Sequence, residues 1–132
     1  MKEPYSFMIE NSESYKVHIV ILTWKNNKIL KRCLESIENV DHKNFTISVI
    51  DNNSSDDSLK MISENFPNVQ TIKNSKNFKF GRGYNEGLKK INVEDNDFII
   101  LLNDDTIVSR NFIDELINPL AKDQKAIIST PK

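Results

Sequence analysis

Short apolar runs rich in β-branched residues alternate along this chain with segments whose apolar residues recur at helical spacing. The expected strands are residues 17–23, 46–51, 69–73, 97–102 and 126–129. The run at 17–23 has no polar alternation, which is typical of a strand covered on both faces. Helical stripes between the runs predict helices at about 28–39, 59–66, 84–91 and 112–120. This order predicts an α/β fold with a mainly parallel sheet and helices on both faces.

Length, charge and cysteine content narrow the function classes. A chain of 132 residues with a net charge of −1 suits one domain, and no basic stripe suggests a nucleic-acid partner. The lone Cys33 excludes an internal disulfide, and nothing approaches the roughly 18 apolar residues that a membrane span needs. We expect a polar lead-in at residues 1–15 and a domain at 16–132. We expect the protein to be located in the cytoplasm, or bound peripherally at the inner face of the membrane.

Polar clusters follow three of the expected strands. Thr23 and Trp24 follow the first, residues 51–55 follow the second, and residues 103–106 follow the fourth. Ligands in parallel α/β sheets bind outside the carboxyl ends of the strands. These clusters are remote in sequence but are expected to share one edge of the sheet.

Several classes of protein that commonly have such a fold are disfavoured, because the sequence lacks their motifs. The turn after the first strand, "TWKNNK", has no glycine, which argues against a dinucleotide-binding fold or a methyltransferase. The Gly-Lys-Ser/Thr motif of phosphate-loop NTPases is absent. A phospho-acceptor receiver domain carries its acidic pair after the first strand, whereas Asp104 and Asp105 follow the fourth.

The adjacent carboxylates of Asp104 and Asp105 end an apolar run, where like charges are unfavourable without a cation. With no histidine or thiolate beside them they suit Mg2+ or Mn2+, which one or two carboxylates hold together with substrate phosphates. Such a cation neutralises a leaving diphosphate. Asp51 can only accept hydrogen bonds, so it needs a donor such as the imide N–H of uracil or thymine.

Four segments together resemble glycosyltransferases of family 2, the inverting GT-A group that includes rhamnosyltransferase-like enzymes. They are "VHIVILTWKNNKILKRCLESI", "VIDNNSSDDS", "NFKFGRGYNEGL" and "LLNDDT", the last resembling a variant of the metal-binding Asp-x-Asp motif. The resemblance covers about residues 17–132. It implies the Rossmann-like, nucleotide-sugar-binding half of a GT-A fold, in a chain truncated before the acceptor-binding half.

The resemblance implies metal-dependent transfer of a sugar, with inversion, from a nucleotide-diphosphate sugar to an acceptor hydroxyl. Asp51 favours a UDP- or dTDP-sugar, although guanine also offers an N–H. The acceptor would be a glycan or a lipid-linked molecule in polysaccharide or cell-surface glycan synthesis. Family enzymes carry their acidic general base in the half that follows, so no residue here is assigned that role. The alternative is a nucleotide-sugar-binding module, or a fragment that lacks the catalytic base. A nucleotidyltransferase-like function fits less well, because its glycine-rich, lysine-bearing loop after the first strand is not seen.

The resemblance also assigns residues to donor binding. They are Thr23, Trp24, Asp51, Asn53, Asn77, Lys79, Arg82, Asn85, Asn103 and Asp104. Asp105 is the expected metal ligand. The glycines at 81, 83 and 87 would let the backbone approach the nucleotide.

Within that set, Thr23 and Trp24 would border the base, and Asp51 would accept its N–H. Asn103 would approach the ribose and diphosphate, towards which Lys79 and Arg82 would bring positive charge. Lys79 stands where the family usually has glycine, so it must avoid the left-handed conformation or accept strain.

Three single residues also have a simpler structural explanation. Trp24 fits a buried core aromatic as well as a ring flanking the base. His18 is expected to be a hydrogen-bonded core residue, and Cys33 a packing residue on the first helix.

Overall fold

A computed structural model describes residues 15–123 and 125–131. Its strands are β1 (Val17–Thr23), β2 (Phe45–Asp51), β3 (Gln70–Lys73) and β4 (Phe98–Asn103), and its helices are α2 (Asn27–Ile37), α3 (Ser58–Asn65), α4 (Phe80–Leu88) and α5 (Phe112–Lys122). The strands form one sheet in the order β3-β2-β1-β4, and every pairing in it is parallel. Apart from Tyr15, the expected lead-in lies outside the described residues.

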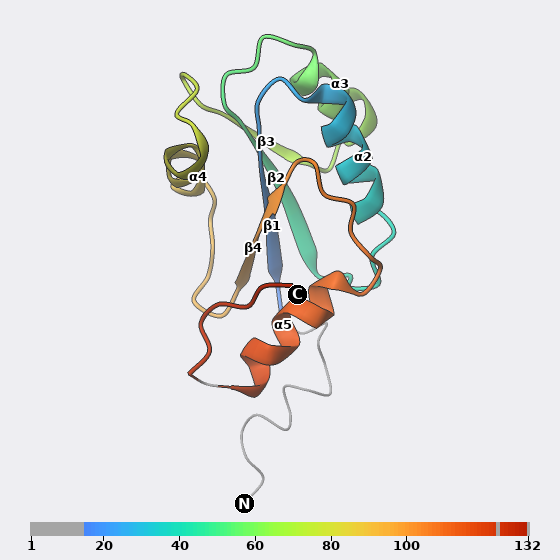
Figure 1. Ribbon diagram of the computed structural model, residues 1–132, viewed down its shortest axis with the longest axis vertical. Helices are drawn as coiled ribbons and strands as arrows, with labels where there is room; N and C mark the ends of the chain where they lie inside the picture. Colours follow the sequence, from blue (N-terminus) through green and yellow to red (C-terminus); the bar gives the residue numbers. More distant parts are fainter. Residues whose placement is uncertain (1–14, 124, 132) are drawn as a thin grey trace, which may run out of the picture.

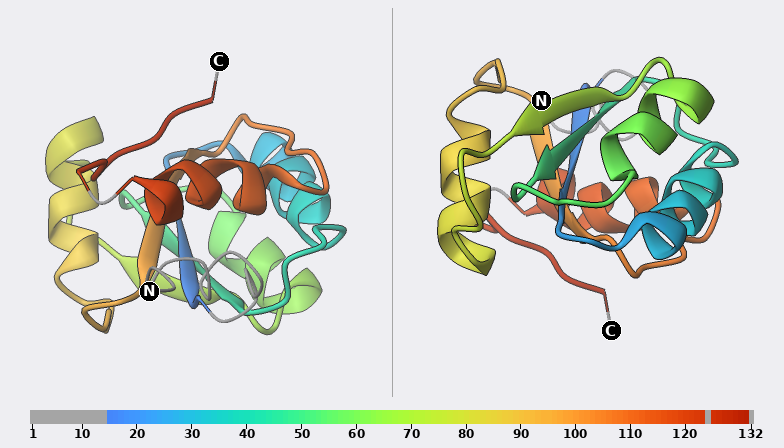
Figure 2. Two further views of the ribbon diagram at one scale, coloured as in Figure 1. Left: turned by 90° about the horizontal axis from the view of Figure 1, so that it is seen from below. Right: turned by 90° about the horizontal axis from the view of Figure 1, so that it is seen from above.

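Helices cover both faces of the sheet, which confirms the predicted α/β architecture. Figure 1 shows α4 on the opposite side of the sheet from α2 and α3, and the end-on views of Figure 2 show the same arrangement. The larger core cluster joins Ile19 and Ile21 of β1 to residues of α2, α3 and α5, while the smaller one joins Val20 to residues of β2, β3 and α4. None of the helices in the described part of the chain is long and apolar enough to cross a membrane.

The two expected core residues are buried as predicted. His18 on β1 hydrogen-bonds through one ring nitrogen to Asp97, at 2.8 Å, and through the other to Thr46, at 3.0 Å. Cys33 packs within the larger core cluster on α2.

The expected fifth strand does not form. Residues 126–129 are irregular, and Ile127 and Ile128 are exposed. A β-branched run becomes a strand only where a neighbouring strand pairs with it. This segment instead runs beside α5, where the hydroxyl of Ser129 donates to the carbonyl of Leu116.

The apolar run that forms β4 is not fully buried. Ile99 and Leu101 are 45% and 55% exposed. They lie on the same face as Val20, because Leu101 is paired with Val20 in the ladder. The smaller core cluster on this face contains no β4 residue, so α4 leaves this face of the edge strand open.

Two glycines of α4 have a packing role. A Cβ added at Gly87 would lie 2.2 Å from Cδ1 of the buried Ile50, and one at Gly83 would lie 2.8 Å from Nδ2 of Asn52. They therefore let α4 approach the sheet closely. Gly81, in contrast, faces open space.

Replacing Gly87 with alanine is expected to lower the free energy of unfolding by about 1–3 kcal/mol, because Ile50 cannot move away from the new methyl group. The matched change Gly81→Ala in the same helix is expected to raise it by roughly 0.5–1 kcal/mol. Urea denaturation of both variants measures the difference. Equal effects of the two changes would contradict the packing role of Gly87.

Candidate functional site

The carboxyl edge of the sheet brings the three polar clusters together, as predicted. The ladder pairs Thr23 of β1 with Asp51 of β2, and Leu22 with Asn103 of β4. The segments that follow these strands lie at the upper end of the sheet in Figure 1. Residues that are far apart in sequence therefore border one region.

A hydrogen bond between Thr23 and Asp104 joins the first and last of these clusters. The hydroxyl of Thr23 donates to the carboxylate of Asp104 at 2.8 Å, and Thr23 itself is buried. The Thr23 side chain thus contacts Asp104. Asp105 is exposed, and its carboxylate accepts no hydrogen bond from any other described residue.

Two buried groups lie close to the acidic pair. Burial and, after it, the negative charge of Asp104 raise the pKa of the Cys33 thiol to about 11. The thiol points to the carbonyl of Asn103 at 3.7 Å. Burial also raises the pKa of the Tyr84 hydroxyl to about 12, again with a contribution from Asp104. Both groups therefore stay protonated and neutral at neutral pH beneath the carboxylates.

The carboxylates can hold a divalent cation only as part of a shared shell. No group of three or more His, Cys, Asp or Glu side chains suited to a metal occurs within residues 15–123 and 125–131. A pair of carboxylates matches the way Mg2+ binds, with water and substrate phosphates filling the other positions. Asp104 and Asp105 fit that arrangement, and Asp105 is the carboxylate left unengaged.

Asp51 reaches the same edge but is fully buried. Both carboxylate oxygens accept the backbone N–H of Ser54, at 3.2 and 3.1 Å, so the side chain shapes the turn after β2. Asn53 stands within this turn with a φ of 62°. A carboxylate has lone pairs beyond those that one N–H uses, so a base N–H could be accepted once this turn opens.

Three asparagines form a network that the sequence only partly indicated. Nδ2 of Asn74 donates to Oδ1 of Asn52 at 2.9 Å, and Nδ2 of Asn52 donates to Oδ1 of Asn77 at 3.2 Å. Oδ1 of Asn77 also accepts the backbone N–H of Lys79 at 2.8 Å. Asn74 is not among the residues predicted for the site. Its position directly after β3, at the carboxyl edge of the sheet, is the sequence signal that indicates it.

The network leaves one acceptor without a donor. Oδ1 of Asn74 is buried and accepts no hydrogen bond from the described residues. Its amide cannot turn over without loss, because Nδ2 donates to Asn52 and to the carbonyl of Gly83. This carbonyl oxygen is therefore a buried acceptor whose hydrogen-bonding capacity the described residues leave unused.

Backbone strain is concentrated at this edge. The non-glycine residues with positive φ among the described residues are Lys25, Asn53 and Lys79, one after each of β1 and β2 and one just before α4. Lys79 has φ 65° and ψ −165°, a conformation that only glycine adopts readily. Of the two possibilities left by the sequence, the lysine therefore accepts strain, at a cost of roughly 1–3 kcal/mol.

A groove of about 510 Å³ runs along the edge. It is lined by Leu22, Thr23, Trp24, Asn26, Asn52, Asn77, Lys79, Phe80 and Asp104. Trp24 is 48% exposed, with the ammonium of Lys25 5.0 Å from its ring, so the core-aromatic explanation is wrong. Arg82 and Asn85 do not line the groove; the guanidinium of Arg82 stacks on Phe78 at 4.7 Å.

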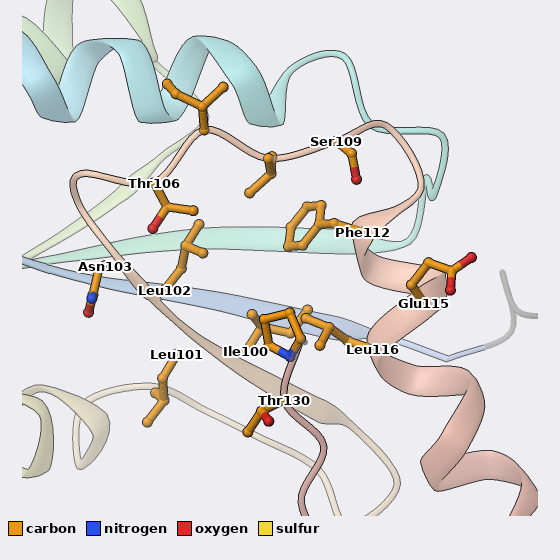
Figure 3. Close-up of a pocket in the computed structure, with 13 residues that line it drawn as sticks. Ile100, Leu101, Leu102, Asn103, Thr106, Ser109, Phe112, Glu115, Leu116 and Thr130 are labelled. Atoms are coloured by element: carbon orange, nitrogen blue, oxygen red, sulfur yellow. The ribbon is translucent and has the colours of Figure 1, made fainter.

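A larger pocket of about 770 Å³ lies on the other side of Asn103 (Figure 3). Its walls are mainly apolar and come from β4, residues 106–109, α5 and residues 130–131. It is open because β4 is the edge strand. We place the chemistry in the groove, since the hydrogen-bonded pair Thr23 and Asp104 lines the groove and not this pocket.

Comparison with known families decides the relationship of this chain to other proteins. The sequence model described as "Glycosyl transferase family 2" matches residues 18–131. This chain belongs to glycosyltransferase family 2. The sequence resemblance to that family is thereby confirmed, and a search of curated proteins found no match.

Solved structures similar to this family 2 chain share its fold at low identity. The mannosyltransferase PcManGT from Pyrobaculum calidifontis, in complex with GDP-Man and Mn2+, has a TM-score of 0.72 at 16% identity over 83% of this chain. S. aureus TarS 1-349 in complex with UDP-GlcNAc has 0.70 at 17% over 89%. Glucosyl-3-phosphoglycerate synthase from Mycobacterium tuberculosis, solved with Mn2+, UDP and glucosyl-3-phosphoglycerate, has 0.66 at 14% over 92%. This chain covers 34%, 37% and 45% of those chains, respectively.

Relief of the strain at Lys79 is expected to stabilise the family 2 fold. Lys79→Gly should raise the free energy of unfolding by about 1 kcal/mol, because glycine adopts this φ and ψ without a Cβ clash. Lys76→Gly, three residues earlier and outside the positive-φ set, should lower it slightly by loosening the unfolded chain. Denaturant titrations compare the two variants. A destabilised Lys79→Gly would show that no strain is stored there.

Proposed function

We propose that this chain is the donor-binding part of a glycosyltransferase. It transfers a sugar with inversion from a UDP- or dTDP-sugar to a hydroxyl of a glycan or lipid-linked acceptor. The observation that carries the proposal is the Thr23–Asp104 hydrogen bond, which holds Asp104 against a groove that Trp24, Asn52 and Asn77 also line. The complexes of similar folds with GDP-Man, UDP-GlcNAc or UDP support a nucleotide-diphosphate ligand.

In this proposal different side chains bind different parts of the donor. Asp105 binds Mg2+ or Mn2+, and Thr23 keeps Asp104 oriented beside it. The cation, when bound, neutralises charge on the leaving diphosphate. Lys79 adds positive charge at the groove, and Trp24 offers a half-exposed ring to the base.

The remaining assignments rest on the family resemblance and their place at this edge. Asp51 accepts the base N–H after its turn opens, with Asn53 in that turn. Asn77 lines the groove, whereas Asn103 lines the larger pocket and approaches the ribose and diphosphate only if the donor extends past Asp104. Asn85 and Arg82 reach it only if the donor extends over α4, since neither lines the groove.

A nucleotide-sugar-binding module without turnover is the second candidate. Among the described residues that line the groove, the carboxylate is that of Asp104. It is already hydrogen-bonded to Thr23 and lies beside the proposed cation, so it is not assigned as the general base. Family enzymes have their general base in a following half, so residues 16–132 would then bind the donor without activating an acceptor. Donor hydrolysis and transfer, assayed on this chain and on a version extended by an acceptor-binding half, separate the two candidates.

Removal of the proposed metal ligand should abolish the metal dependence of nucleotide binding. UDP or dTDP should stabilise the wild type more with Mn2+ than with EDTA, and at about 100 times its Kd the nucleotide should add roughly 2.7 kcal/mol with Mn2+. Asp105→Ala should lose this increment, because one carboxylate of the pair is gone, whereas Asp95→Ala, an exposed aspartate outside the site, should keep it. Thermal shift with a nucleotide panel, with Mn2+ or EDTA, measures this. An equal Mn2+-dependent increment in wild type and Asp105→Ala would refute the assignment.

Substitution of Asp51 should remove the preference for an imide base. Asp51→Asn keeps the shape and an acceptor for the N–H of Ser54, but an uncharged amide accepts the base N–H more weakly. The ratio of Kd values for CDP and UDP, which differ at this N–H, should fall about tenfold. Asp57→Asn, an exposed change in the same loop, should leave it unchanged. An unaltered ratio in Asp51→Asn would take base reading away from Asp51.

A further inference from the structure

Tyr84 is a buried polar residue that the donor-binding assignments do not use. It lies on α4, is 4% exposed, and belongs to the smaller core cluster with Val20, Ile50 and Ile72. Its ring is therefore a packing element. Its hydroxyl, however, reaches past the core to the ends of two strands.

The hydroxyl of Tyr84 binds both strands that carry the Thr23–Asp104 pair. It accepts the backbone N–H of Leu22 at 3.3 Å and donates to the carbonyl of Leu102 at 2.9 Å. Leu22 directly precedes Thr23, and Leu102 lies two residues before Asp104. Leu22 also belongs to the last pair of the β1–β4 ladder, with Asn103. The hydroxyl thus closes the ladder at the point where the two strands give way to the site.

The glycines of α4 make this reach possible. Gly83 and Gly87 let the helix approach Asn52 and Ile50, at separations that any Cβ would prevent. The same helix begins at the strained Lys79, and Phe80 packs edge-on against Tyr84 with ring centroids 5.2 Å apart. Lys79 and Phe80 line the groove, so Tyr84 connects the groove wall to the end of β4.

The end of β4 has little other support on this face. Ile99 and Leu101 are exposed there, because the core beneath α4 does not extend to the edge strand. A protonated phenol is needed to donate to Leu102, and burial keeps the Tyr84 hydroxyl protonated by raising its pKa to about 12. The charge of Asp104 acts in the same direction.

We propose that Tyr84 is a positioning residue that holds the end of β4 against β1 and thereby sets where the acidic pair binds the divalent cation. The inference rests on the proposed function. It predicts that the metal-dependent part of nucleotide binding needs the Tyr84 hydroxyl, while the metal-free part does not. Residues that orient metal ligands typically change metal affinity by 10–100-fold when they are removed.

Tyr84→Phe tests this by removing the hydroxyl and keeping the ring in the core. The probe is whichever of UDP, dTDP and GDP stabilises the wild type. Isothermal titration calorimetry measures the Kd of this nucleotide, once in the presence of Mn2+ and once in the presence of EDTA. With Mn2+ the Kd should rise about tenfold or more. With EDTA it should change by less than about twofold. Amide hydrogen exchange at residues 103–106 should also become faster.

Tyr15→Phe is the matched control. Tyr15 packs edge-on against Phe98, where β4 begins, at 5.2 Å between ring centroids, so the change loses a tyrosine hydroxyl away from the site. It should leave the Kd with Mn2+ unchanged. Comparable weakening of both variants, or weakening of Tyr84→Phe to the same degree with EDTA, would mean a general structural role and overturn the inference.

The outcomes also separate this inference from the proposed function. Metal-dependent binding in the wild type that Tyr84→Phe retains in full overturns the role of Tyr84 alone. A wild type that binds none of the three nucleotides with Mn2+ overturns the proposed function, and the inference with it.

Discussion

The parallel pairing of β1 with β2 on one side and β4 on the other is the constraint on which the rest of the structure depends. β1 is the central strand, and its alternate residues supply both cores, Ile19 and Ile21 on one face and Val20 on the other. Because a one-residue slip would exchange the faces, burial on both sides sets the register firmly. That register places Thr23 beside Asp51 and Leu22 beside Asn103, so the site is a consequence of core packing.

The edge that results combines several unfavourable features. Positive φ at Lys25, Asn53 and Lys79, adjacent carboxylates at 104 and 105, and an unpaired acceptor on Asn74 each cost free energy in the isolated chain. Such features persist where the surrounding structure holds them in place, and they cluster at functional sites. Here the asparagine network and the Thr23–Asp104 hydrogen bond hold these features in place. A bound cation and nucleotide would lower part of their free-energy cost.

Patterns of short range were enough to predict most of the fold, and failed where a partner element was needed. The β1 run and the α2 stripe could be predicted from their own residues, since both are buried as their periodicity indicated. Residues 126–129 have the composition of a strand but pair with no neighbouring strand. The apolar run of β4 resembles that of a buried strand, but β4 is the edge strand and α4 does not cover it. The packing of Gly87 in α4 against Ile50 could not be predicted, because only the tertiary structure shows which side chain lies against this glycine.

The sequence by itself determined the α/β order, the shared edge of the three polar clusters and membership in glycosyltransferase family 2, because strand periodicity and motif residues are local properties of the chain. Only the tertiary structure decided how these residues are used. It turned Thr23 towards Asp104, buried Asp51 against Ser54, exposed Trp24, and brought Tyr84 of α4 to the ends of β1 and β4. Each of these depends on contacts between segments distant in the sequence, and side-chain direction and burial are fixed by such contacts and not by residue type.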